Sequence, residues 1–103
     1  MTATVIARPT IKSKEVKLKK DGSTITVRAT NAERPRRLEH TLERCSLAYK
    51  SHEIRSISKD GVLNVTVTVR YDDVRLTGDI REDAKSRSDL NEAMDRIVES
   101  LLS

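Results

Sequence analysis

The chain is poor in the residues that usually build a large core or a catalytic site. Phe and Trp are absent from its 103 residues, and Tyr49 and Tyr71 are the only aromatic residues. Any core is therefore built from Val, Leu, Ile and Ala, and a chain of this length buries only about two-thirds of its unfolded surface. We expect one domain, residues 1–103, with a thin core that a partner subunit could complete.

Several chemical signatures are also missing. The single Cys45 cannot form an internal disulfide, which favours a reducing compartment, and no neighbouring group indicates an activated thiol. There is no Cys/His metal spacing, no phosphate-binding glycine loop and no nucleophile elbow. No apolar run approaches the ~20 residues needed to span a membrane. We expect no enzyme activity, no cofactor, no metal, no small-molecule substrate and no membrane partner.

What is present is a strongly alternating segment, Val62–Tyr71, the pattern of a strand with one packed face and one open face. Its polar side carries Asn64, Thr66, Thr68 and Arg70, with hydroxyl groups and no carboxylate. Residues 1–70 have a net charge of +8, whereas residues 71–103 have −4. A basic β-rich body with an acidic helix on its far side favours a polyanionic partner such as RNA.

Two Lys-Asp-Gly turns, at residues 20–22 and 59–61, predict two hairpins. Thr4–Ala7 and Val74–Thr77 are expected to be additional short strands. The flanks of the two turns differ, so no internal repeat is inferred. The prediction is an α+β fold: an antiparallel sheet of about six strands, an N-terminal hairpin, and a C-terminal helix on the sheet of its own or a partner subunit.

Two segments leave alternatives. Residues 34–47 fit a helix slightly better than a strand, because Leu38, Leu42 and Cys45 have helical spacing. The register of the 49–71 hairpin is also open: a two-residue turn would place Ser58, Ser56 and Ile54 on the apolar face, whereas a longer loop would place the intervening residues there. The uneven alternation of Ser51–Ser58 favours a bulge.

The C-terminal segment is an amphipathic helix whose apolar stripe must lie on a sheet, its own or a partner's, and we expect the stripe residues to form the dimer interface. The stripe comprises Leu90, Ala93, Met94, Ile97, Val98 and Leu101.

At Ser46-Leu47-Ala48-Tyr49-Lys50 the chain resembles the coat proteins of small single-stranded RNA bacteriophages. The following long hairpin and the helix containing Asp89-Leu90-Asn91-Glu92-Ala93-Met94 match that family in order. The resemblance implies interlocked dimers that assemble into an icosahedral virion shell made in the host cytoplasm. It also implies a sheet face that binds genomic RNA, including a hairpin through which the coat represses translation, and a strand over residues 37–44.

The RNA-binding residues predicted from the polar strand face and this resemblance are Lys50, His52, Arg55, Asn64, Thr66, Thr68 and Arg70. The turn at residues 72–73 is much shorter than the family's loop at the symmetry axes, and the chain lacks the family's second short helix. The alternative is a small dimerising α+β accessory subunit of a cellular RNA-modifying complex, which a helix over residues 34–47 would favour. Nothing in the sequence indicates the RNA recognised, the host or the shell size.

Overall fold

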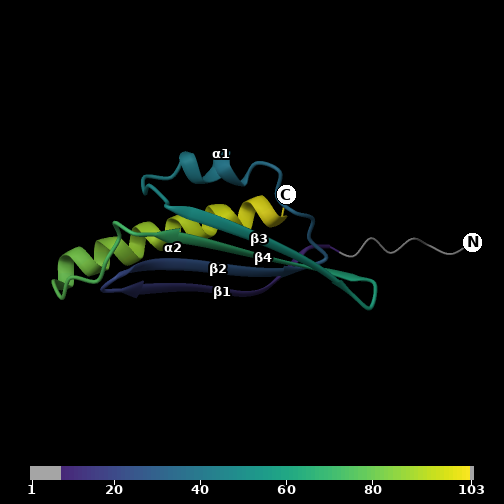
Figure 1. Cartoon of the computed structure of the whole chain (residues 1–103), viewed down its shortest axis with the longest axis horizontal. Coiled ribbons are helices and arrows are strands. Elements are labelled where there is room, and N and C mark those ends of the chain that lie inside the picture. Colours follow the sequence, from purple (N-terminus) through teal and green to yellow (C-terminus); the bar gives the residue numbers. More distant parts are fainter. Residues whose placement is uncertain (1–7, 103) are drawn as a thin grey trace, which may run out of the picture.

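The structure, a computed structural model, describes residues 8–102 and folds them into one antiparallel sheet with two helices (Figure 1). The elements are β1 (Thr10–Lys19), β2 (Gly22–Thr30), α1 (Leu38–Glu43), β3 (Ser51–Lys59), β4 (Val62–Tyr71) and α2 (Ile80–Leu102). The sheet order is β1-β2-β4-β3, so the two hairpins meet through the central strands β2 and β4. The predicted α+β class is confirmed, but the sheet has four strands among the described residues rather than about six.

The strand predicted over Val74–Thr77 is wrong, because this segment is a loop that passes the end of the first hairpin. The Ser23 hydroxyl donates to the carbonyl of Val74, and the Leu76 amide donates to the carbonyl of Lys19 at 2.8 Å. Val74 is buried by this path. Its apolar side chain therefore fills the end of the core without pairing along a sheet edge. The strand expected at Thr4–Ala7 lies outside the described residues.

The ambiguous segment contains a short helix, α1, which confirms the preference based on residue spacing. The strand over residues 37–44 that the bacteriophage resemblance implied is wrong. Leu38 and Leu42 are one helical turn apart, and both are buried. The helix therefore contributes an apolar edge to the core, in contact with α2.

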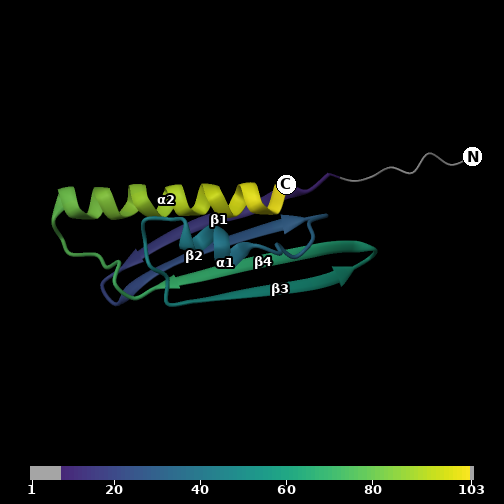
Figure 2. The ribbon, with the colours of Figure 1, turned by 90° about the horizontal axis from the view of Figure 1, so that it is seen from above.

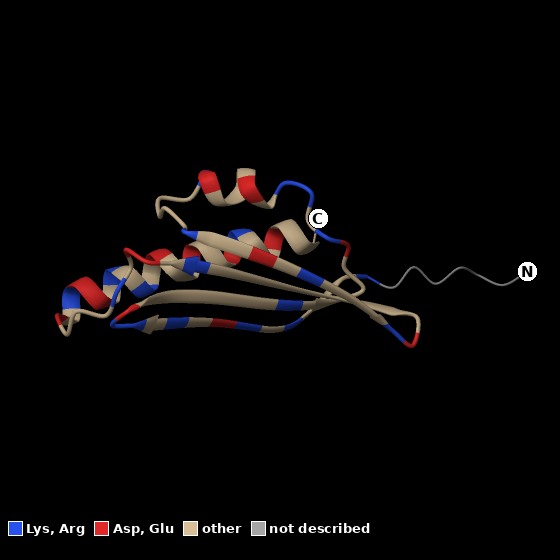
Figure 3. Cartoon of the chain, viewed as in Figure 1, with Lys and Arg blue, Asp and Glu red and all other residues tan. Residues whose placement is uncertain are grey.

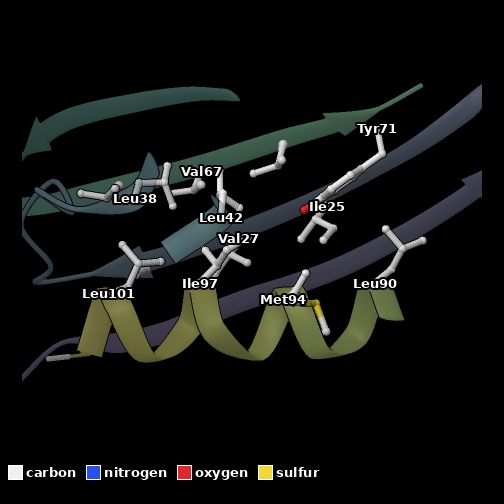
Figure 4. Packing of buried hydrophobic residues seen from close by; sticks show 14 of the residues in the cluster. Ile25, Val27, Leu38, Leu42, Val67, Tyr71, Leu90, Met94, Ile97 and Leu101 are labelled. Atoms are coloured by element: carbon white, nitrogen blue, oxygen red, sulfur yellow. The ribbon is translucent and has the colours of Figure 1, made fainter. Parts of the chain in front are cut away.

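Alternation in the two central strands creates the core. Ile25 and Val27 on β2 lie opposite Val69 and Val67 on β4, and all four are fully buried. Figure 4 shows Ile25, Val27 and Val67 facing the labelled side chains of α1 and α2. This is the covered face of the sheet.

Helix α2 lies along β1 and β2, as seen from above in Figure 2. Its apolar stripe, which we had assigned to a dimer interface, packs on the chain's own sheet instead: Leu90, Ala93, Met94, Ile97 and Leu101 are buried, and Val98 is half-buried. Exposure of the stripe therefore provides no reason for the chain to dimerise. No helix within residues 8–102 is long and apolar enough to cross a membrane.

The register of the second hairpin follows the two-residue turn. Asp60 and Gly61 adopt positive φ angles of 54° and 76°, and Ser58 lies opposite Leu63. The bulge predicted in β3 is wrong, because its pairing with β4 is continuous. A register shift occurs instead in the first hairpin, between Ile11 and Ser13.

Candidate nucleic-acid interface

The sheet has a second face, which neither helix covers. On the central strands this open face is formed by Thr24, Thr26 and Arg28 of β2 and by Asn64, Thr66, Thr68 and Arg70 of β4. The Thr and Asn side chains are half-buried and both arginines are exposed. On the central strands the open face therefore consists of half-buried hydrogen-bonding side chains and two exposed arginines.

Five of the predicted RNA-binding residues occupy this face together. Thr66 lies between Arg55 of β3 and Arg28 of β2, and Arg70 lies next to Thr24. Asn64 and Thr68 complete the set on β4. Side chains directly opposite each other on neighbouring strands have Cβ atoms about 5 Å apart. A single ligand can therefore contact several of these residues at once.

Lys50 lies at the edge of the open face, in the loop that enters β3. Its amide donates to the carbonyl of Arg70 at 2.7 Å, and its Nζ lies 2.8 Å from Oδ2 of Asp72. The hydrogen bond from Lys50 lowers the pKa of the Asp72 carboxyl. Because this carboxylate partly neutralises Lys50, we expect the lysine to contribute less to anion binding than an unpaired arginine does.

His52 is on the wrong face to join the predicted RNA-binding set. It lies opposite Val69 on the covered face, 5.6 Å from the ring of Tyr49 between centroids. Its Nε2 is 3.4 Å from Glu39 Oε1, and its buried Nδ1 has no hydrogen-bond partner. The side chain borders a cavity of about 840 Å³ between β3 and the segment that leads into α1. The regular two-residue register places His52 there, whereas the sequence left that register open.

The contribution of the first hairpin to the open face was not predicted. Arg28, Thr24 and Thr26 of β2 are adjacent to the predicted residues of β4. The alternation of Ser23–Thr30 places the apolar Ile25, Val27 and Ala29 on one side of this strand, and all three are buried. The same alternation defines its polar side, Thr-x-Thr-x-Arg, and this signal could have identified the missing residues.

The central strands of the open face carry two charged side chains, and both are arginines. Both acidic residues on the face are paired within their own strands: Glu15 with Lys17 at 3.2 Å, and Glu53 with Arg55 at 2.7 Å. Each central strand carries one charged residue, Arg28 on β2 and Arg70 on β4, as Figure 3 shows. Neither arginine has an ion pair among residues 8–102. These two guanidinium groups are therefore available to an anionic ligand.

Other parts of the described chain offer little reactive chemistry. Burial raises the pKa of the Cys45 thiol, whose Sγ donates to the carbonyl of Thr41 at 3.3 Å. A raised pKa lowers the thiolate fraction and so makes the thiol a poorer nucleophile. No group of three or more His, Cys, Asp or Glu side chains within residues 8–102 could hold a metal ion.

The chain matches no protein-family model, no curated protein and no solved structure in comparisons of these three kinds. The candidate site must therefore be interpreted from its own geometry and chemistry.

Proposed function

We propose that this chain is a structural coat protein that binds RNA on its open face, dimerises and assembles into an icosahedral shell. The observation that carries the proposal is the open face itself: a four-stranded sheet with hydroxyl and amide groups and two unpaired arginines. Phosphate contacts dominate RNA affinity, and hydroxyl groups recognise sugars and base edges. Through an RNA hairpin the same face would also repress translation.

The arrangement of the two sheet faces supports the assembly. Both helices lie on one side and the polar face lies on the other, so a shell with the helices outward would line its interior with Thr and Arg. The edge strands β1 and β3 can accept a further strand through their free backbone groups. On β3 the large apolar residue Ile57 is 62% exposed. We propose that two subunits join their sheets at this edge, since the α2 stripe is already used within the chain.

The second candidate is the accessory subunit of a cellular RNA-modifying complex. The specific observation in its favour is α1, which is a helix where the coat-protein resemblance implied a strand. This candidate shares the RNA-binding face and differs in having no shell.

The RNA-binding part of the proposal predicts different roles for the two sides of the molecule. Arg70→Ala should weaken binding to single-stranded RNA about tenfold, and Lys50→Ala should do so less, because Asp72 already pairs with Lys50. The controls are Arg87→Ala and Arg96→Ala on α2, which should leave affinity unchanged. With about four phosphate contacts, the logarithm of the association constant should fall with the logarithm of salt at a slope near −3. Equal losses at all four positions would indicate diffuse charge attraction and contradict a specific face.

Assembly is tested by expressing the chain alone and examining the purified material by negative-stain electron microscopy with nuclease treatment. The coat proposal predicts regular particles that protect host RNA. The short turn at residues 72–73 leaves little chain for contacts at symmetry axes, so we expect particles that are less stable than those of the bacteriophage family or different in size. A homogeneous small species without protected RNA, at low and moderate salt, would favour the accessory-subunit candidate.

A further inference from the structure

The sheet register aligns the two hairpins residue by residue. Ser13 and Glu15 of β1 lie opposite Arg28 and Thr26 of β2. Ser51 and Glu53 of β3 lie opposite Arg70 and Thr68 of β4 in the same way. On the central strands Thr24-Ile25-Thr26-Val27-Arg28 matches Thr66-Val67-Thr68-Val69-Arg70. Both turns contain Lys-Asp-Gly, but the turn residues are Lys20-Asp21 in the first hairpin and Asp60-Gly61 in the second, longer one. The two hairpins differ in length at their turns, so β1 must be aligned with β3 and β2 with β4 separately. The sheet register provides both alignments.

The segment after each hairpin extends the repeat. Leu38-Glu39-His40-Thr41-Leu42-Glu43-Arg44-Cys45 resembles Leu90-Asn91-Glu92-Ala93-Met94-Asp95-Arg96-Ile97 in its apolar spacing and in its arginine. The helices α1 and α2 run in opposite directions over the same sheet face (Figure 1). The strands of the two hairpins are therefore related by an approximate two-fold axis through the middle of the sheet. The helices follow this relation only in direction, since α1 has 6 residues and lies against α2, whereas α2 has 23 and lies along β1 and β2.

This axis passes between Thr26 and Thr68, which lie directly opposite each other on the central strands. On one side of it Arg28 is opposite Thr66, and on the other side Arg70 is opposite Thr24. Four residues along a strand and one strand spacing separate the two arginines, a distance of about 14 Å between their Cα atoms.

The edge-strand neighbours of the two arginines are equivalent as well, although Asp72 lies near Arg70 and the matching position near Arg28 is Thr30. Arg28 has Ser13 as its neighbour on the edge strand β1, and Arg70 has Ser51 on the edge strand β3. The two edge ion pairs described above, Lys17 with Glu15 and Arg55 with Glu53, also exchange places under the two-fold operation. Each half of the open face therefore presents one free guanidinium beside hydroxyl groups.

A ligand that uses both positions equally must itself have two equivalent anionic parts. A single RNA strand has one chemical direction, so it would cross the two positions in opposite senses and could not contact both in the same way. The two antiparallel strands of a duplex are related by local two-fold axes, and symmetric proteins align their own axis with these. Double-stranded RNA also displays 2′-hydroxyl groups in a wide, shallow minor groove, where phosphate and hydroxyl contacts dominate recognition.

We propose that the open face binds a base-paired RNA stem across this internal two-fold axis. Arg28 and Arg70 hold phosphates of opposite strands, and Thr26 and Thr68 face the 2′-hydroxyl groups between them. This inference rests on the proposed RNA-binding function and names the form of RNA that the face takes. One chain supplies both halves of the site, so a monomer is sufficient to bind one stem.

The test measures binding of the full chain by fluorescence anisotropy to three probes. They are a self-complementary RNA duplex of about 12 base pairs, a single-stranded RNA of equal length that cannot pair, and a DNA duplex of the same sequence as the first. We expect the RNA duplex to bind at least tenfold more tightly than either other probe. Arg28→Ala and Arg70→Ala should weaken duplex binding by equal factors, each lowering the steepness of the salt dependence by about one contact. Both arginines are exposed, so these variants should keep the wild-type melting temperature.

Each result has a distinct meaning. Tighter binding of the single strand, with losses in both variants, would overturn the duplex inference and leave RNA binding on the open face intact. Equal binding of the RNA and DNA duplexes would exclude a role of the 2′-hydroxyl groups and would overturn the inference that the face selects an RNA stem. Effects of Arg28→Ala and Arg70→Ala that differ by more than tenfold would contradict the two-fold equivalence. Failure of all three probes to bind would overturn the proposed function together with the inference.

Discussion

The same strands form both faces of the sheet, but different physical requirements govern each face. On the covered face Val27 and Val67 are fully buried, and their role is to fill volume beneath the helices. On the open face their sequence neighbours Thr26 and Thr68 reach solvent only in part, and no described element packs on them. The covered face is explained by packing alone, whereas the open face requires a further explanation.

Strand propensity accounts for part of the open face. Threonine is β-branched and favours strands, so a row of threonines can serve the fold without any ligand. The same argument does not explain Arg28 and Arg70, which have no ion pair among the described residues and lie at matching places in the two halves. Strand propensity therefore explains the threonines, and the arginines are the residues of the open face on which the proposed RNA binding depends.

The largest expected effect comes from placing a charge on the covered face. Ile97 is fully buried between α2 and the sheet, so Ile97→Asp should cost about 4 kcal/mol of unfolding free energy or more, because the carboxylate would have no partner there. The matched control is Asn91→Asp, which adds the same charge on the exposed side of α2 and should change stability by less than about 0.5 kcal/mol. Urea denaturation followed by circular dichroism measures both. A small decrease in the unfolding free energy of Ile97→Asp would mean that α2 does not pack on the sheet as described.

The sequence predicts an element well where its own periodicity determines its structure, and poorly where contacts with other elements determine it. Strand β4 and helix α2 were predictable because their periodicities are long and regular. The loop at Val74–Thr77 was not, because its apolar residues are buried by passing the end of the first hairpin, and periodicity carries no information about that path. The register of β3 was uncertain because Ser56 and Ser58 occupy covered-face positions near the hairpin tip, where the sheet has little covering and polar residues are tolerated.

The site was half predicted for a related reason. Arg70 and the threonines of β4 were predicted from the alternation of one strand, whereas Arg28 lies on the other hairpin and was not predicted. Only the pairing of β2 with β4 shows that the two Thr-x-Thr-x-Arg segments share a surface. His52 was misplaced because it can share a face with Arg55 only if a bulge lies between them, and the pairing of β3 is continuous.

Exchanging Val and Thr at one position on each face tests whether the two faces have different roles. Val67→Thr keeps the shape of a fully buried residue but adds a hydroxyl without a partner, which should cost about 1–3 kcal/mol of unfolding free energy. Thr66→Val makes the reverse exchange on the open face, should alter stability by less than about 0.5 kcal/mol, and should weaken RNA binding several-fold. Thermal or urea unfolding and anisotropy separate the two outcomes. If Thr66→Val left RNA affinity unchanged, that hydroxyl would serve only strand propensity.

The smallest effect concerns the loop through which the chain passes from the sheet to the covering helix. Asp83 accepts hydrogen bonds from the amides of Thr77 and Gly78 at 2.8 and 3.0 Å and from the Thr77 hydroxyl at 3.0 Å. The Thr77 amide is the largest cause that lowers the pKa of this carboxyl. A lowered pKa in the folded state means that the carboxylate stabilises the protein fully above the unfolded value of about 3.9, and that this contribution disappears as the pH falls through the lower folded value.

Asp83→Asn should therefore unfold at lower urea concentration than the wild type near neutral pH, and the difference should shrink as the pH falls below about 4. Asp72→Asn is the matched control, because Lys50 also lowers the pKa of Asp72 but the pair is exposed and screened by salt. Urea midpoints across an acid pH series at low and high salt should show a persistent difference for Asp83→Asn and a salt-sensitive one for Asp72→Asn. A difference for Asp83→Asn that stayed constant with pH would show that the change disturbs the loop by shape, since the loss of a carboxylate alone must follow its titration.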